Sequence, residues 1–290
     1  MRFPECLANA YDFISKVFKK FLKDNGGLIA AAVAFFIFIS LIPLLLLFVS
    51  ALGYILGSVG KAENIIFDFL HTYAPALTSQ SKEGLKDVVA SIIYGRGTIG
   101  GIGLIGLIWT GSSAFTNLHL AVNIAWGTPN DRGFVKTRLL SLGLLLGVGV
   151  MLLATFGITT ALNIIWSKDV SVFGISPGDI PFIWTFLAYV VPVLVTIAAF
   201  TLMYKVLPTR PEPFSTALIS GVTAGVLWEL AKYTFSWYIT RFAYYSAVYG
   251  SLAGLIIAII WIYYASIIMI LAAEVGAVYG EHIGARHRNT

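Results

Sequence analysis

The sequence is poor in charged residues and nearly free of cysteine. Only 11% of its 290 residues are Asp, Glu, Lys or Arg, and 58% are hydrophobic, whereas soluble domains carry roughly a quarter charged residues. This balance predicts an all-α, polytopic membrane protein. The single cysteine, Cys6, excludes an internal disulfide and fits no metal-ligand spacing.

Catalytic signatures are missing as well. The four histidines form no metal-binding pair at helical spacing, and the sequence has no nucleophile elbow and no glycine-rich phosphate loop. A nuclease would need clustered carboxylates to hold metal ions, and the acidic residues form no such group. We therefore expect no catalytic residue, no metal, no cofactor and no nucleic-acid partner, and we do not expect an enzyme.

Six apolar runs are each long enough to cross the hydrocarbon core, which takes roughly 20 residues. They lie near residues 28–57, 99–125, 138–165, 181–206, 214–239 and 248–274. Residues 28–280 thus form a transmembrane domain of six helices, and residues 281–290 form a basic cytoplasmic tail. The sequence leaves the oligomeric state open.

Two prolines indicate broken helices. The first run would reach about 45 Å if it were upright, so it must tilt, protrude or break. Pro43 supplies a natural break or hinge after Ser40. Pro192 lies at the equivalent place in the fourth run if the fold consists of two inverted three-helix halves. Broken helices at matching positions mark transporter binding sites, although membrane helices tolerate proline for other reasons too.

Basic residues predict the orientation. With the N-terminus inside, twelve Lys and Arg residues fall on the inner side and six on the outer side. Cytoplasmic loops of membrane proteins carry such an excess of basic residues. Both termini are therefore expected in the cytoplasm, and the longest outer loop, residues 58–97, is expected to form two short helices.

Residues 1–27 have the pattern of an amphipathic helix. Apolar residues recur at steps of three and four, and lysines fall mainly on the other side. The apolar set is Leu7, Ala10, Tyr11, Ile14, Val17, Phe18, Phe21 and Leu22, and the lysines are Lys16, Lys19, Lys20 and Lys23. The pattern fits a helix lying flat on lipid headgroups and equally a helix packed on the protein's own cytoplasmic face. Membrane lipids are the expected partners.

A polar stripe marks the second run. Ser112, Thr116, His119 and Asn123 are four, three and four residues apart, so they share one face of a helix. Hydrogen bonds between helices explain such a stripe, and so does a substrate or ion path.

Charged residues interrupt the fifth and sixth runs. Glu229 and Lys232 are three apart and share a helix face, roughly 22 and 27 Å from Phe214 at 1.5 Å per residue. Lys232 can extend outward to the interface, so Glu229 is the more costly residue in lipid and the stronger candidate for an ion or substrate path. Glu274 reaches the inner end of the sixth run, where capping of the helix or pairing with the region of Arg286 is expected.

Several stretches carry a resemblance to a known family. The stretches are FFIFISLIPLLLLFVSALG from Phe35, the exit of the second run at Asn123, Trp126 and Gly127, GVLWELAKYTFSWYI from Gly225, and YGSLAGLIIAIIWIYYASIIMILAAE from Tyr249. Over nearly its whole length the chain resembles the BrkB/YihY family of bacterial inner-membrane proteins. The resemblance implies six membrane helices in the cytoplasmic membrane. It also implies a link to serum resistance or to transport of ions or lipid precursors, and an older ribonuclease label of this family is regarded as mistaken.

Three interpretations of function follow. The first is a permease-like transporter of an ion, a small solute or a lipid-related substrate, with a polar path between the second and fifth spans. The second is a non-transporting scaffold or envelope-maintenance factor whose buried charges only hold helices together. The third is a membrane enzyme acting on lipid.

Overall fold

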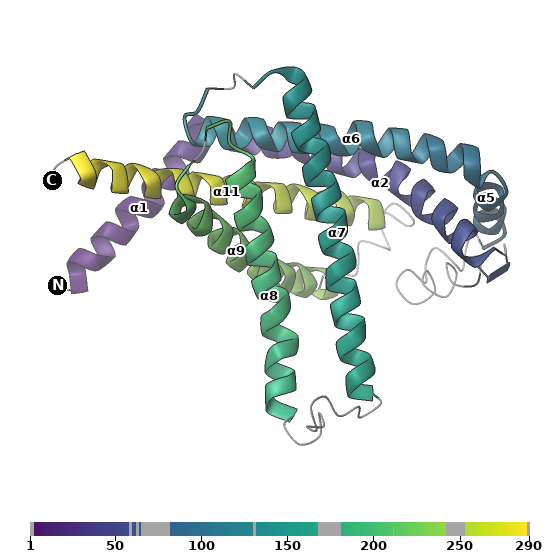
Figure 1. The fold of residues 1–290 in the computed structure, drawn as a ribbon. Helices are drawn as coiled ribbons and strands as arrows, with labels where there is room; N and C mark the ends of the chain where they lie inside the picture. The colour runs from purple at the N-terminus through teal and green to yellow at the C-terminus, as the bar shows by residue number, and fades with distance from the viewer. Residues whose placement is uncertain are drawn as a thin grey trace. The chain divides into compact units, whose positions relative to one another are not determined.

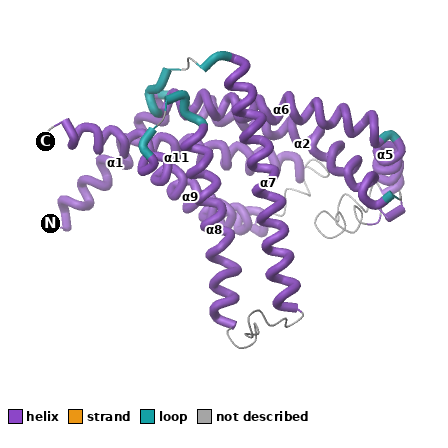
Figure 2. The backbone as a smooth tube through the Cα atoms, in the orientation of Figure 1, coloured by secondary structure: helices purple, strands orange, loops and turns teal. Residues whose placement is uncertain are grey.

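The computed structural model describes residues 3–57, 60–61, 64, 82–129, 132–167, 181–210, 212–241 and 253–288. Within these ranges the regular structure is helical, as Figure 2 shows. The helices labelled in Figure 1 are α1 (Phe3–Lys23), α2 (Gly26–Leu56), α5 (Lys82–Tyr94), α6 (Arg96–Ala125), α7 (Phe134–Ser167), α8 (Pro181–Val206), α9 (Phe214–Arg241) and α11 (Ala253–Arg288). The all-α prediction is confirmed for the described part of the chain.

Four helices in the described ranges are long and apolar enough to cross a membrane. They are Gly26–Leu56, Arg96–Ala125, Phe214–Tyr238 and Gly254–Glu281, and a shorter apolar stretch covers Val190–Val206 of α8. The predicted third and fourth runs are helical as α7 and α8. The chain is therefore a polytopic membrane protein.

The segments outside the long apolar runs are partly described. The first short helix expected in the outer loop, around residues 65–73, lies outside the described residues, whereas the second is present as α5. The expected N-terminal helix is present as α1. Because α11 continues to Arg288, most of the expected tail at 281–290 extends this helix.

Neither predicted helix break occurs. Pro43 lies inside α2 and Pro192 lies inside α8, and both helices continue through their proline. A complete break is therefore not observed at either position, and a hinge at Pro43 or Pro192 stays a prediction. Proline removes the backbone hydrogen bond to the carbonyl four residues earlier, here that of Ile39 and that of Ala188. Membrane helices tolerate this loss where neighbouring helices or local adjustments satisfy the freed carbonyl.

The chain divides into two compact units, which are described separately. The first contains Met1–Ala30, Phe115–Ser236 and Ala265–Thr290, and the second contains Ala31–Ala114 and Trp237–Tyr264. In the second unit α6 approaches α2 through glycines at the level of Pro43. A Cβ atom would lie 3.1 Å from the Pro43 carbonyl oxygen at Gly103, and 3.0 Å from the Pro43 Cβ at Gly106. The neighbouring helix thus accommodates the proline.

In the first unit α9 packs against α8 and α11 through small residues. A Cβ atom at Gly221 would fall 2.1 Å from Thr201 Oγ1 and 2.7 Å from the Thr201 backbone nitrogen. Gly276 of α11 lies just as close to Ser220 of α9. Such close approach of backbones at small residues is common between membrane helices. Tyr204 of α8 is fully buried beside them and donates its hydroxyl to a carbonyl of α11 at 2.6 Å.

A short turn connects α1 to α2. Asn25 has a φ of 55°, in the left-handed region that Asn tolerates and that commonly ends a helix. Gly26 lies under the ring of Phe21, where a Cβ atom would fall 2.4 Å from ring carbons. Phe21 also packs against the buried cluster that joins α2, α6 and α11. The turn therefore attaches α1 firmly to the first unit.

Candidate functional site

The polar stripe of α6 is mostly buried. Ser112, His119 and Asn123 have at most 1% of their surface exposed, and Thr116 is partly buried. Ser112 belongs to the second unit, and its hydroxyl bonds back to the Ile108 carbonyl of its own helix. The other three belong to the first unit and are bonded to other segments.

His119 and Asn123 connect the end of α6 with the segment between α8 and α9. His119 Nδ1 lies 2.5 Å from the Leu207 carbonyl oxygen, so Nδ1 carries the proton and donates it. Nε2 is then an acceptor, and Asn123 Nδ2 donates to it at 3.0 Å. Asn123 Oδ1 accepts from the Thr209 backbone N–H at 2.8 Å and from the Thr128 hydroxyl at 2.6 Å. These bonds define one neutral tautomer of His119 and one orientation of the Asn123 amide.

Thr116 makes the corresponding link to α7. Its hydroxyl lies 3.1 Å from the hydroxyl of Ser141, which is buried. Either oxygen can donate, because each hydroxyl is both donor and acceptor. In the first unit the stripe thus binds α6 to α7 and to the segment after α8.

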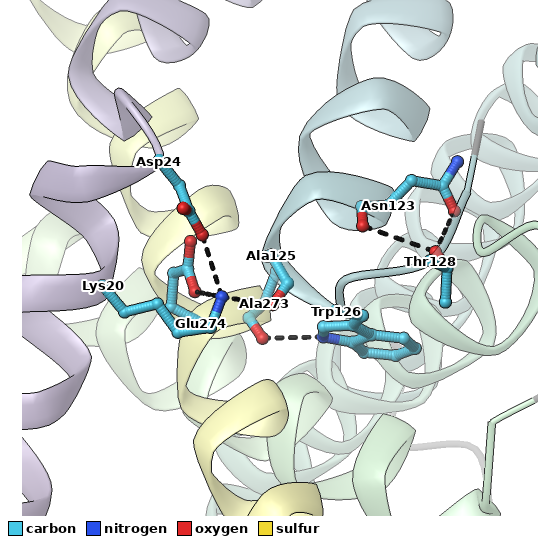
Figure 3. A network of polar contacts seen from close by, with 8 residues as sticks. All are labelled: Lys20, Asp24, Asn123, Ala125, Trp126, Thr128, Ala273 and Glu274. Carbon is cyan, nitrogen blue, oxygen red and sulfur yellow. Dashed lines mark hydrogen bonds and ion pairs between the residues drawn. The ribbon is translucent and has the colours of Figure 1, made fainter.

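A second polar group, the Lys20 cluster, consists of Lys20, Asp24, Ala125 and Glu274 (Figure 3). Lys20 Nζ lies 2.8 Å from Asp24 Oδ2 and 3.2 Å from Glu274 Oε2, and it donates to the Ala125 carbonyl at 2.6 Å. Ala125 is the last residue of α6, where carbonyls lack an intrahelical donor and the helix dipole favours a cation. The cluster joins α1, α6 and α11.

A tryptophan strengthens the same junction. Trp126 Nε1 donates to the Ala273 carbonyl at 2.8 Å, beside Glu274 (Figure 3). The sequence suggested the region of Arg286 as a partner for Glu274, but the structure places Lys20 there, and the Arg286 side chain lies outside the described residues. Nothing local in the sequence points to the contact between Lys20 and Glu274. The four-residue spacing of Lys20 and Asp24 predicts only the contact between those two residues.

Glu229 and Lys232 are partners of each other on α9. Lys232 Nζ lies 2.8 Å from Glu229 Oε1, and the side chains are 46% and 21% exposed, respectively. Lys232 is therefore the partner of Glu229 Oε1, and the charges of the two groups balance each other on one face of α9.

Two ionisable groups outside the membrane-spanning helices have shifted pKa values. Burial lowers the pKa of Lys20, but the hydrogen bond to Asp24 and the charge of Glu274 outweigh burial, so the pKa is raised above its ordinary value. Lys20 thus stays charged at physiological pH. Burial raises the pKa of Glu212, between α8 and α9, and the charge of Lys205 offsets only part of this effect.

The described part of the chain contains no group of three or more His, Cys, Asp or Glu residues that could hold a metal ion. Its long apolar helices and buried polar clusters define a multi-pass membrane protein. A family model described as virulence factor BrkB matches residues 17–290. The chain therefore belongs to the virulence factor BrkB family.

Relatives of this chain include proteins that are named as membrane proteins. The UPF0761 membrane proteins PsycPRwf_0630 of Psychrobacter sp. (strain PRwf-1) and RC1_0578 of Rhodospirillum centenum are 28% and 27% identical, over 91% and 97% of this chain. This chain spans only 48% and 60% of their lengths. The ribonuclease-like protein YfkH of Bacillus subtilis is 25% identical over 92% of this chain and 94% of its own. No solved structure matches the chain.

Proposed function

We propose that the chain is a permease-like transporter with six spans in the bacterial cytoplasmic (inner) membrane and both termini in the cytoplasm. α2, α6, α9 and α11 supply four of these spans, and α7 and α8 supply the other two. The excess of Lys and Arg on the inner segments supports the orientation. The substrate would be an ion, a small solute or a lipid-related molecule, and no enzymatic step or nucleic-acid partner is part of the proposal.

The Glu229–Lys232 pair carries this proposal. Charged side chains in a membrane helix are costly and tend to mark substrate or ion pathways. Pairing removes the net charge, but both groups remain charged within a candidate membrane span, where holding charges is costly. The carboxylate could bind a cation or a solute N–H or O–H group, and the ammonium could bind a solute oxygen. We therefore place substrate contact at Glu229 and Lys232.

The α6 stripe has a supporting role in this proposal. His119 and Asn123 use their side-chain atoms in bonds to backbone and hydroxyl groups of the protein. Such bonds position helices, and they would have to break before a substrate could use the same atoms. Along the expected path between the second and fifth spans, we therefore propose that the substrate contacts side chains of α9 and not the polar stripe of α6.

The proposal is tested by measuring the flux of probe molecules across liposome membranes that contain the protein. The purified full chain is reconstituted and offered a panel of cations, anions and labelled lipids. We expect wild-type flux of at least one probe, and a roughly tenfold or larger loss in Glu229→Gln and Lys232→Met, which corresponds to about 1.4 kcal/mol. Glu281→Gln, at an exposed site on α11, is the matched control and should keep wild-type flux. Full flux in both α9 variants overturns the assignment.

A non-transporting scaffold is the second candidate. The observation in its favour is that the buried polar groups of α6 are bonded within the protein. In that case no probe crosses with the wild-type chain. The α9 variants would then change the melting temperature of the protein, whereas flux would be absent throughout.

A further inference from the structure

Helix α1 presents an unusual row of exposed apolar side chains. Tyr11, Ile14, Phe18 and Leu22 are exposed by 76, 56, 54 and 70% of their surface. They are three or four residues apart, so they lie on one face of the helix. A face of this kind is not stable in water unless something covers it.

The helix is already held to the protein by a different side. Val17 is buried at 3% exposure, and Phe21 packs on the core of the first unit. Lys20 is bound in its cluster with Glu274. Because these contacts fix the rotation of α1 about its axis, the apolar row faces away from the first unit's core.

A basic row flanks the apolar one. Lys16, Lys19 and Lys23 are exposed and are three and four residues apart, so they share a third side of the helix. Lys16 lies 2.7 Å from the Asp12 carboxylate, which offsets its positive charge. Lys19 and Lys23 therefore supply most of the positive charge next to the apolar row.

The position of α1 along the chain places it beside the membrane. Two residues separate its end at Lys23 from the start of α2, a candidate span, and Leu28 near that start is 74% exposed. Lys20 also binds the last carbonyl of α6, another candidate span. The C-terminal end of α1 consequently lies where two spans meet the interface.

We propose that α1 binds an anionic phospholipid surface, with Tyr11, Ile14, Phe18 and Leu22 in the acyl boundary and Lys19 and Lys23 at the headgroups. Apolar and basic rows side by side are the features that hold a helix in the plane of a membrane surface, and each lysine near an anionic leaflet adds attraction. Positive charge beside the apolar row favours this occupant over a second copy of the chain, whose α1 carries the same charge. This binding is independent of transport.

A spin label tests where the two sides of α1 lie in the full chain. Cys6→Ser removes the native thiol, and a label is placed through Ile14→Cys or, as a matched control, Asp12→Cys, which lies roughly 200° away around the helix. The protein is studied in nanodiscs of phosphatidylcholine alone or with phosphatidylglycerol. Oxygen reaches a label that lies in lipid, and a water-soluble nickel complex reaches a label that lies in water. Where the spectrum has two components, their intensities give the ratio of label immersed in lipid to label free in water.

The expected result is an immersed label at residue 14 and an aqueous label at residue 12 in phosphatidylglycerol discs. Lys19→Gln with Lys23→Gln should lower the immersed-to-free ratio there by roughly fivefold per lysine and leave the ratio in phosphatidylcholine unchanged. A water-exposed label at residue 14 overturns the proposal. So does a label shielded from both reagents, which indicates a protein partner, or a ratio that does not respond to anionic lipid or to the lysine changes.

Discussion

Lys20 of α1 and Glu274 of α11 lie 3.2 Å apart between Nζ and Oε2, although they come from opposite ends of the chain. Glu274 is almost completely buried, and Lys20 is only about one-fifth exposed. Asp24 binds the same ammonium group at 2.8 Å, so two carboxylates share one cation. The N-terminal helix is therefore part of the folded unit.

Lys20→Met should destabilise the protein. The variant leaves Glu274 buried without its cation, and loss of one partner of a buried ion pair costs on the order of 3 kcal/mol. The midpoint of thermal unfolding in detergent measures the effect. Lys19→Met, at an exposed site one residue away, is the control and should melt close to wild type. Equal midpoints for the two variants would show that the Lys20 cluster contributes nothing to stability.

His119→Leu should also destabilise the protein, because the Leu207 carbonyl loses the donor at His119 and the Asn123 amide nitrogen loses its acceptor there. Each buried polar group left unpaired costs about 1–3 kcal/mol. Thr128→Val removes just one of two donors to Asn123 Oδ1 and should cost less. In the wild type, the ¹⁵N chemical shifts of His119 should report a neutral ring protonated at Nδ1. A ring protonated at Nε2 alone contradicts the assignment.

Gly221→Ala should weaken the packing of α9 on α8. The new Cβ atom would overlap the backbone of Thr201, and overpacking of this kind costs about 1–3 kcal/mol. Gly143→Ala is the control, since no heavy atom lies within 4 Å of the added Cβ and Ala is the better helix former. The free energy of unfolding should fall for the first variant and hold or rise for the second. The opposite order would contradict the close approach at Gly221.

Pro43→Ala should retain the helical content of the protein. Because α2 is continuous through Pro43, alanine keeps the Cβ that faces Gly106 and restores a backbone donor. Pro43→Leu adds bulk against Gly103 and Gly106 and should lower the melting temperature. Circular dichroism and thermal unfolding compare the two. Loss of helix in Pro43→Ala would show that α2 depends on the proline.

Much of the architecture was readable from the sequence. The apolar runs predicted the long helices, and the three- and four-residue spacing around Ile14 and Phe18 predicted α1. Of the two alternatives for α1, packing on the protein is observed at Val17, whereas contact with lipid stays a proposal that rests on outward side chains such as Phe18. Local patterns sufficed here because helix formation depends on neighbours a turn apart and membrane insertion depends on the length of an apolar run.

The tertiary structure determined which buried side chains and carbonyls contact one another. Proline rules favoured breaks at Pro43 and Pro192, but α2 and α8 continue through them, and facing glycines of α6 make room for Pro43. Spacing placed Glu229 beside Lys232, whereas Glu274 could be matched with Lys20 only after the chain had folded. Composition and periodicity act along the chain, so the sequence by itself determined a membrane protein of long helices. The contacts of buried polar groups depend on segments brought together from distant positions, so only the fold determined which charges and carbonyls meet.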